Sequence, residues 1–386
     1  MVNFRNIFKQ KFEMLKDLGY LGSSNIVGVG ISAIFWFYLA NLLGAEEYGQ
    51  IQYYIAIAGI VYLISSFASP NSITIYAAKN IKIHSTLYLV SLVGGIIAIL
   101  VILGVFQRLD VGLLVFGFII YDLAIYYFLG KKWYAKYSKN FLLQKILAAI
   151  FAIGFYYIFG LEGIIYGLAL SYVHLSIVVY KILRESKIDF SVLKSRGGFI
   201  TNNYFESAIS GVRGEIDKII IAPMLGFMIL GNYALAMQVY VVLMIFSSVI
   251  YKYVLPQDAS GVSNYILKKI SIFIAIGISI LGITVVPIIL SLFFPKFEDA
   301  VIAIQIMSIS VVPATIGYMY ISKFLSIEKS KFVLLGRIVS LSTLVLGMII
   351  LPKIFGMAGA AGAFVLSTCV TTSFFVLAYE KIRVKK

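Results

Sequence analysis

Long apolar runs separated by short polar breaks fill the sequence from residue 20 onward. Each run has the length of about 20 residues that an α-helix needs to cross a bilayer core about 30 Å thick. The pattern therefore predicts an all-α, polytopic membrane protein. Its twelve expected membrane-spanning helices lie near residues 20–43, 50–69, 85–106, 111–130, 141–160, 163–183, 199–225, 231–255, 269–294, 300–327, 332–352 and 357–379.

The first 19 residues follow a different pattern. Apolar residues, among them Phe4, Phe8 and Phe12, recur at helical spacing between lysines and an arginine. The segment is too polar to form the apolar core of a signal peptide. We therefore expect residues 1–19 to form an interfacial amphipathic helix on the membrane surface.

The composition agrees with a protein that lies in lipid. Hydrophobic residues make up 61% of the chain and charged residues only 13%, whereas soluble proteins carry about 25% charged residues. A single cysteine, Cys369, excludes a disulfide framework, and two histidines are too few for most metalloenzymes. No glycine-rich phosphate-binding loop is present in the sequence. We therefore expect no catalytic residues, no metal and no cofactor.

The net charge is +15, and the basic residues are distributed as in a membrane protein. If the N-terminus is cytoplasmic, 26 Lys and Arg residues fall in cytoplasmic segments and 3 in outer loops. Cytoplasmic loops retain basic residues in this way. The charge therefore predicts a multi-pass protein of the cytoplasmic membrane with both termini inside, and it requires no nucleic acid as a partner.

Two halves of the sequence resemble each other. Five residues recur after 182 positions, a second group recurs after 188, and a third recurs after 196. This duplication predicts an N-terminal six-helix lobe over residues 20–183, a cytoplasmic linker over 184–198 and a C-terminal six-helix lobe over 199–386, with a central cavity between the lobes. The first group pairs Leu43, Gly44, Gly49, Ser65 and Ser66 with Leu225, Gly226, Gly231, Ser247 and Ser248. The second pairs Phe106, Arg108 and Asp110 with Phe294, Lys296 and Glu298. The third pairs Ile158, Phe159, Gly160 and Gly163 with Ile354, Phe355, Gly356 and Gly359.

Polar side chains concentrate in the seventh predicted span. A charge at the centre of a bilayer costs at least about 2.5–3.5 kcal/mol, so each one needs a partner, water or a function. The spacing of four of these residues places them on one face of a helix, which we expect to meet a polar cavity. The residues of the span are Asn202, Asn203, Glu206, Ser210, Arg213, Glu215, Asp217 and Lys218.

Two interpretations of these charges stay open. In the first, Arg213 pairs with Asp217 and Glu215 pairs with Lys218, and the pairs lock the span to its neighbours. In the second, the charges line a pathway for a charged substrate. Under that interpretation Arg213 and Lys218, with the amides Asn25, Asn202 and Asn203, line the substrate cavity. Coupling or ion-pairing groups would then be Glu206, Glu215, Asp217 and, in the fourth span, Asp122. For Asp122 a hydrogen bond between neighbouring helices is an equally open interpretation.

Three stretches of the chain carry a recognisable pattern. The first is Asn25 with Gly28 and Gly30, followed by the turn over Leu39–Gly49. The second leads from Asp217 through Gly226 to Gly231–Ala234, and the third comprises Phe294–Ala300 and Phe355–Ala361. In order and spacing they resemble the Wzx-type polysaccharide flippases of the multidrug/oligosaccharidyl-lipid/polysaccharide exporter superfamily.

The resemblance implies a function. Such proteins move a polyprenyl phosphate- or diphosphate-linked oligosaccharide from the cytoplasmic to the outer leaflet by alternating access, commonly coupled to an ion gradient such as H+ or Na+. Their cationic cavity residues engage the acidic headgroup, a role that Arg213 and Lys218 match here, whereas the first span offers Asn25 but no Arg or Lys. Membrane lipids and other polysaccharide-assembly membrane proteins are the further partners implied.

Two other functions compete with flipping. An ion-coupled multidrug or cation antiporter of the same superfamily would be favoured by acidic rather than basic dominance in the cavity. A membrane-embedded glycan polymerase or ligase would act on the same glycolipids, but the sequence provides no long outer loop for its active site.

Overall fold

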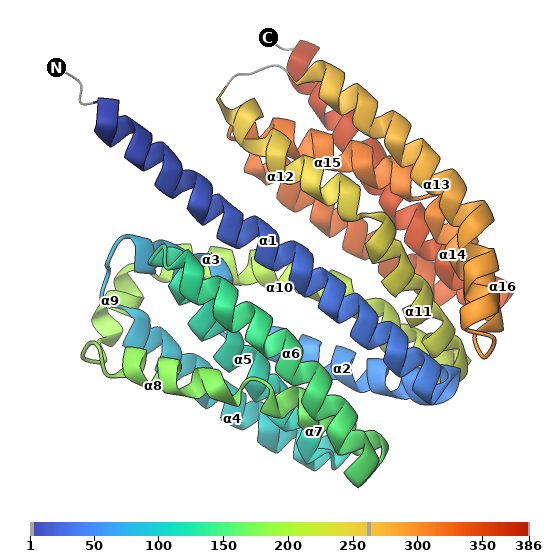
Figure 1. Cartoon of the computed structure of the whole chain (residues 1–386), viewed down its shortest axis with the longest axis horizontal. Coiled ribbons are helices and arrows are strands. Elements are labelled where there is room, and N and C mark those ends of the chain that lie inside the picture. The colour runs from blue at the N-terminus through green and yellow to red at the C-terminus, as the bar shows by residue number, and fades with distance from the viewer. Residues whose placement is uncertain (1–3, 261–263, 385–386) are drawn as a thin grey trace. The chain divides into compact units, whose positions relative to one another are not determined.

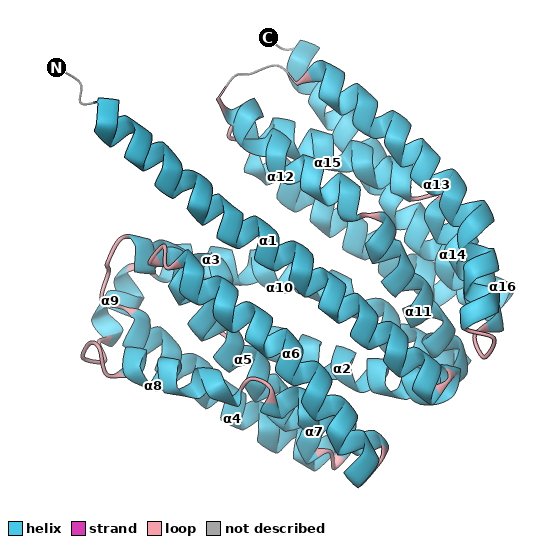
Figure 2. Cartoon of the chain, viewed as in Figure 1, coloured by secondary structure: helices cyan, strands magenta, loops and turns pink. Residues whose placement is uncertain are grey.

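The protein is built from helices. The computed structural model describes residues 4–260 and 264–384, and every regular element in these ranges is a helix (Figure 2). In lipid, a helix satisfies its backbone N–H and C=O groups within its own segment, which is why apolar runs of this length fold in this way. The all-α prediction is therefore confirmed.

The helices follow one another with short connections (Figure 1). Their bounds are α1 Phe4–Leu43, α2 Ala45–Ser65, α3 Pro70–Ala78, α4 His84–Phe106, α5 Leu109–Gly130, α6 Tyr134–Phe159, α7 Leu161–Leu170, η1 Val173–Leu175, α8 Ser176–Leu183, α9 Phe190–Ser195, α10 Gly197–Leu225, α11 Phe227–Leu243, α12 Ile245–Ala259, α13 Tyr265–Phe293, α14 Glu298–Ser308, α15 Val311–Ser326 and α16 Ser330–Val384.

The number of spans agrees with the twelve predicted. Seven helical stretches in the described part of the chain are long and apolar enough to cross a membrane, and three further helix pairs qualify as bent spans. One of the seven, α16, consists of two helices that meet at Gly356, where φ is +54°. Counting both parts of α16 and adding the 29-residue α10, whose charges lower its hydropathy, gives twelve.

The first helix is longer than expected. Residues 4–43 form one continuous helix, α1, so that the predicted interfacial segment over 1–19 runs directly into the first span (Figure 1). Residues 1–3, and the side chains of residues 4–18, lie outside what the structure describes. The position of this segment on the membrane surface therefore stays a prediction.

The chain divides into two compact units. The first unit comprises Met1–Trp36 and Ile57–Ala208, and the second comprises Phe37–Ala56 and Ile209–Lys386. The boundary thus falls inside α10, beyond the linker expected at 184–198, and the second unit also includes the start of α2. The boundaries of the two units therefore differ from those of the predicted six-helix lobes, and the lobes remain a prediction.

Each unit is organised around interior helices, α5 in the first unit and α14 and α15 in the second. In the first unit α5 packs against α3, α4, α6 and α7, and two thirds of its most apolar stretch is buried. In the second unit α14 packs against α11, α13 and α16, while α15 packs against α12, α13 and α16. These interior helices present few side chains to lipid, so they are free to carry polar groups.

The structure repeats the sequence duplication. Gly44 and Gly226, which are 182 residues apart, both have positive φ, and so do Gly160 and Gly356, which are 196 apart. The bent pair α2–α3 has its counterpart in α11–α12, with bends of 49° and 45°. A positive φ is readily adopted by glycine alone, so these four glycines terminate corresponding helices in the two repeats.

Two equivalent glycines also hold the repeats together inside the second unit. A Cβ atom on Gly49 would overlap the backbone carbonyl of Phe227, and one on Gly231 would overlap the carbonyl of Ala45. Both pairs follow the offset of 182, so the contact between α2 and α11 is reciprocal. This close approach explains why the start of α2 belongs to the second unit.

We predict that Gly49→Ala destabilises the protein. The added methyl group would overlap the backbone carbonyl group of Phe227, which cannot move aside as a flexible side chain could. Overpacking of this kind costs about 1–3 kcal/mol of folding free energy. Thermal unfolding of the purified protein in detergent measures the effect as a lowered Tm. The matched control is Gly277→Ala in α13, where no atom lies within 4 Å of the new Cβ. An equal Tm for the two variants would contradict the close approach.

Candidate functional site

The most polar membrane helix is α10. It begins at Gly197 and ends at Leu225, directly before Gly226 with its positive φ. The face predicted from the sequence is present as a helical surface, but the boundary between the units divides it. Glu206 lies in the first unit, whereas Ser210, Arg213 and Asp217 lie in the second.

Two arginines join α10 to α16 within the second unit. The Arg213 Nε donates a hydrogen bond to Ser340 Oγ at 2.5 Å. In return, Arg337 Nη1 of α16 donates to Ser210 Oγ of α10. Each helix therefore contributes a serine and an arginine three residues apart, and we call this reciprocal arrangement the Arg–Ser clasp.

The clasp is anchored to both parts of α16. Ser340 lies in the first part, and Ser367 of the second part donates from its Oγ to the Ser340 carbonyl oxygen at 2.8 Å. The Arg213 guanidinium lies 5.9 Å from the centre of the Phe364 ring, which also belongs to the second part. Ser340 and Ser367 are buried. The position of Arg213 is thus defined by groups that are electrically neutral.

Lys218, by contrast, is paired with carboxylates. Its Nζ lies 2.8 Å from Glu215 Oε2 and 4.0 Å from Asp217 Oδ1, and it donates to the Gly214 carbonyl oxygen at 3.0 Å. The expected pair of Glu215 and Lys218 is therefore present. The expected pair of Arg213 and Asp217 is wrong, because among the described residues Arg213 bonds to Ser340 and forms no ion pair with Asp217.

Asp217 is the most enclosed member of this group. It is 2% exposed, and its Oδ2 accepts a hydrogen bond from the hydroxyl of Tyr233 at 2.8 Å. Tyr233, on α11, is itself completely buried. Because a carboxylate in such surroundings needs donors and a counter-charge, Tyr233 and Lys218 together account for its presence in the membrane.

These contacts separate the charges in and around the part of α10 that lies in the second unit into two sets. Glu215, Asp217 and Lys218 form a compact group with one net negative charge. The Arg–Ser clasp brings two positive charges whose described hydrogen-bond partners are serine hydroxyls. Arg213 in particular offers a guanidinium group that suits a phosphate, because its described partners are a serine hydroxyl and an aromatic ring rather than a carboxylate.

The remaining predicted residues lie in the first unit. The amide of Asn25 donates to the Leu21 carbonyl oxygen at 2.7 Å, and that of Asn203 donates to the Phe199 carbonyl oxygen at 2.9 Å. Asn202 is exposed. Glu206 accepts a 3.4 Å hydrogen bond from Asn71 on α3. The structure therefore does not bring these four residues into one cluster.

Asp122 has an aromatic environment on α5. Its carboxylate accepts a hydrogen bond from the Tyr62 hydroxyl of α2. The Tyr62 ring in turn packs edge-on against Phe118, with ring centres 5.8 Å apart. Among the described residues no Lys or Arg forms an ion pair with Asp122. A carboxyl group in this setting is suited to take up a proton or a cation.

Sequence reasoning missed the role of Arg337. Arg337 lies near the end of a predicted span, where a basic side chain usually reaches toward the headgroups. The signal that could have identified it is the pair Arg337 and Ser340, which repeats the three-residue spacing of Ser210 and Arg213 in reverse order. Such a pattern matters only once the side chains of α10 and α16 are known to reach one another.

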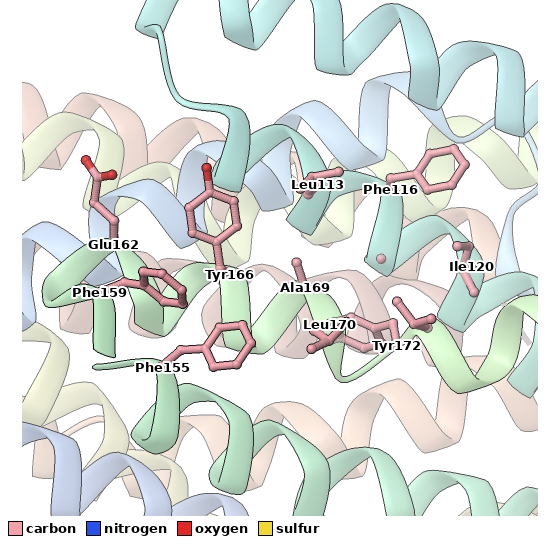
Figure 3. Close-up of a pocket in the computed structure, with 12 residues that line it drawn as sticks. Leu113, Phe116, Ile120, Phe155, Phe159, Glu162, Tyr166, Ala169, Leu170 and Tyr172 are labelled. Atoms are coloured by element: carbon pink, nitrogen blue, oxygen red, sulfur yellow. The ribbon is translucent and has the colours of Figure 1, made fainter. Parts of the chain in front are cut away.

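A cavity in the first unit has a different character. It has a volume of about 680 Å³ and lies among α5, α6 and α7. Aromatic and aliphatic side chains such as Phe116, Phe155 and Phe159 line it, and Glu162 is the charged residue at its edge (Figure 3). Arg108 lies 3.5 Å from Glu162. Because this lining contains none of the predicted site residues, the cavity does not enlarge the polar site.

Comparison with known proteins supports the fold. No family model matches the sequence, and no curated protein matches it. Among solved structures, an inward-facing multidrug resistance MATE family transporter of the MOP superfamily has a TM-score of 0.69 at 15% identity, over 92% of this chain and 94% of its own. The lipid II flippase MurJ, in an inward closed conformation, has a TM-score of 0.71 at 12% identity, over 95% and 87%.

A third solved structure is similar over almost the whole length of both chains. It is a MOP superfamily transporter from Pyrococcus furiosus, described as having a binding pocket of reverse polarity, with a TM-score of 0.56 at 17% identity, over 96% of this chain and 97% of its own. At these identities the likeness concerns the fold. The chain has the fold of MOP superfamily transporters, which is the fold that the resemblance in the sequence implied.

We predict that Tyr233→Phe destabilises the second unit. The substitution removes the hydroxyl that donates to buried Asp217 and changes little else, and an unsatisfied buried acceptor costs about 1–3 kcal/mol. The expected result is a lower Tm in thermal unfolding of the detergent-solubilised protein. Tyr253→Phe, at an exposed position of α12, serves as the control and leaves the Tm unchanged. Identical melting of both variants would show that the hydrogen bond contributes nothing.

Proposed function

We propose that this protein is a membrane flippase that moves polyprenyl phosphate- or diphosphate-linked oligosaccharide across the cytoplasmic membrane by alternating access. The observation that carries the proposal is the position of Arg213 in the Arg–Ser clasp, where its described partners are the hydroxyl of Ser340 and the ring of Phe364. A half-buried guanidinium in a membrane helix without a carboxylate partner, such as that of Arg213, is explained if the transported molecule brings the opposite charge.

The chemistry of the clasp fits a phosphate-bearing headgroup. A guanidinium presents planar N–H donors that match phosphate oxygens in pairs. Arg213 uses Nε for Ser340, and the described residues accept no hydrogen bond from its two Nη atoms. In the proposed complex these atoms contact one phosphate, and Arg337 adds a second positive charge one helical turn away. A diphosphate would engage both arginines.

Lys218 takes a secondary role in this mechanism. Its ammonium already has Glu215 and Asp217 as counter-charges, so it must exchange a carboxylate for a phosphate before it can bind the substrate. The amides of Asn25, Asn202 and Asn203 supply hydrogen bonds suited to sugar hydroxyls. We assign coupling or ion pairing to Glu206, Glu215, Asp217 and Asp122.

The fold supports transport as the general activity. The similar structures include a lipid II flippase and multidrug MATE transporters. We propose that the two repeats form lobes around a central cavity that opens alternately to each side, with both termini in the cytoplasm and H+ or Na+ as the coupling ion. In the cell the substrate would come from, and pass to, other membrane proteins of polysaccharide assembly.

Leaflet-resolved quantification of lipid-linked oligosaccharide tests the proposal. Cells that lack the gene should accumulate the glycolipid in the cytoplasmic leaflet, and the wild-type gene should restore its export. We predict that Arg213→Ala lowers the export rate by at least about tenfold, since one charge-assisted hydrogen bond to phosphate contributes about 1.5–3 kcal/mol. Lys218→Ala should have a smaller effect, because Lys218 is already ion-paired.

Two controls make this experiment decisive. Arg213→Lys keeps the charge but loses the planar pair of donors, and it should recover part of the export rate. Export is to be compared only between variants with equal amounts of folded protein in the membrane. Full export by a stably inserted Arg213→Ala, Arg337→Ala double variant would remove the clasp from the mechanism.

A second candidate function is an ion-coupled multidrug or cation antiporter. The observation in its favour is Asp122, a carboxylate among aromatic rings with no described Lys or Arg partner, which suits a lipophilic cation as well as a coupling ion. The two functions place the transported charge in different units. They are therefore separable by mutation.

We predict that Asp122→Asn uncouples transport from the ion gradient. The amide has nearly the shape of the carboxyl group and still accepts a hydrogen bond from Tyr62, but it cannot bind a proton or a cation as a carboxylate does. Glycolipid flipping measured in proteoliposomes should then lose its dependence on an imposed proton or sodium gradient. If the variant instead abolishes efflux of lipophilic cations and leaves flipping unchanged, the antiporter is the better assignment.

A further inference from the structure

The apolar cavity of the first unit is bordered by residues that face lipid. Its lining includes Phe159, Leu170 and Val173, which are 62%, 38% and 52% exposed. Exposed apolar residues on membrane-spanning helices contact acyl chains, which are as apolar as the side chains themselves. The volume of about 680 Å³ falls in the range that is common for ligand sites. An acyl chain can therefore enter this cavity from the bilayer.

A group of three ionisable residues lies at the edge of the cavity. Arg108 donates two hydrogen bonds to Asp110, from Nε to Oδ1 at 2.9 Å and from Nη2 to Oδ2 at 2.6 Å. Its Nη1 lies 3.5 Å from Oε1 of Glu162, which lines the cavity. Among the described residues, no other Lys or Arg forms an ion pair with either carboxylate. One positive charge thus stands against two negative charges, and the group keeps one net negative charge.

Glu162 is the accessible member of this group. Its side chain is 61% exposed, whereas the side chains of Arg108 and Asp110 are 13% and 2% exposed. Figure 3 shows its carboxylate on the same side of α7 as the hydroxyl of Tyr166, beside the aromatic rings of the cavity. A molecule with an apolar chain and a cationic head could therefore place the chain among the rings and the head at Glu162.

The fold itself does not require an acidic residue at position 162. The offset of 196, which pairs Gly160 with Gly356, pairs Glu162 with Ala358. Both glycines have positive φ, so the same turn forms with and without a carboxylate beside it. Glu162 therefore adds a charge that only the first repeat carries at this turn.

We propose that the cavity binds an aminophospholipid, a lipid with a phosphoethanolamine head, from the outer leaflet. One acyl chain lies among the aromatic rings, the ammonium group donates to the Glu162 carboxylate, and the phosphate lies toward Arg108. The head carries one positive and one negative charge, and it meets an acidic and a basic side chain that stand side by side.

Two properties of the site select this lipid. A primary ammonium donates charge-assisted hydrogen bonds to a carboxylate, which the trimethylammonium group of phosphatidylcholine cannot do. A lipid with a net negative head is repelled by the net negative charge of the group. The distribution of Lys and Arg predicts that the turns before α5 and α7 lie on the outer side of the membrane. No residue of the Arg–Ser clasp lines the cavity, so the proposal does not depend on the proposed substrate.

Native mass spectrometry of the full-length protein in detergent tests the proposal with short-chain phosphatidylethanolamine and with phosphatidylcholine of the same chains. We expect phosphatidylethanolamine to bind up to about fivefold more tightly, the largest factor that an exposed ion pair usually contributes. Glu162→Gln should remove this preference, and Glu162→Asp, which keeps the charge, should retain part of it. Excess phosphatidylethanolamine should also raise the Tm of the wild type more than that of Glu162→Gln.

Two further variants separate the head from the chain. Glu47→Gln removes an exposed carboxylate of α2 that does not line the cavity, and it should keep the lipid preference of the wild type. Leu170→Trp adds a bulky ring to the lipid-facing side of the lining, and it should weaken the binding of both lipids. Variants are compared only where their Tm without added lipid equals that of the wild type.

Several results would overturn the proposal. The wild type could bind the two lipids equally, Glu162→Gln could keep the preference, or Leu170→Trp could bind both lipids as the wild type does. If soluble phosphoethanolamine competed as well as the lipid, the cavity would take no part in binding. If tetraphenylphosphonium displaced the lipid at lower concentration than phosphatidylethanolamine itself does, the cavity would belong to a lipophilic cation.

Discussion

The cost of holding charge within a membrane governs the arrangement of the second unit. Asp217 is tolerated because Tyr233 donates to it and Lys218 lies within 4.0 Å, and Lys218 is tolerated because Glu215 balances it. These contacts tie α10 to α11 and define the rotation of α10 about its axis. That rotation in turn places Ser210 and Arg213 against α16, so the Arg–Ser clasp depends on the burial of Asp217.

The clasp differs physically from the ion pairs beside it. A carboxylate partner would hold a guanidinium strongly and cancel its charge, whereas a serine hydroxyl holds it in position at a smaller gain in free energy. Such a group can exchange a hydroxyl for a phosphate without leaving a buried carboxylate unpaired. Lys218 lacks this freedom because its departure would leave Asp217 without a counter-charge. Neutral partners are therefore what makes Arg213 available to the anionic substrate that we propose.

Hydropathy was sufficient to predict the helices, because in lipid an apolar run of about 20 residues has no other regular structure to adopt. It did not predict the bends of α2–α3 and α11–α12, which depend on tertiary packing. The spacing of Arg213 and Asp217 permitted an ion pair, but Ser340 and Tyr233 supply other partners. Only the register between α10 and α16 reveals Arg337, and no local pattern specifies that register.

The two repeats share the turns that define the fold but differ in the polar residues of the proposed sites. Glycines at equivalent positions, Gly44 and Gly226, end corresponding helices with positive φ, so both repeats inherit the same turns. The ionisable groups of the proposed sites do not follow the repeat, unlike Arg108 and Asp110, which recur as Lys296 and Glu298. Asp122 lies within the continuous α5, whereas the corresponding part of the second repeat is broken between α14 and α15 near Ser310, which bonds to the Met307 carbonyl oxygen. Since the proposed coupling carboxyl group, Asp122, lies in one repeat and the proposed phosphate-binding residue, Arg213, lies in the other, the two proposed sites suit ligands of opposite charge.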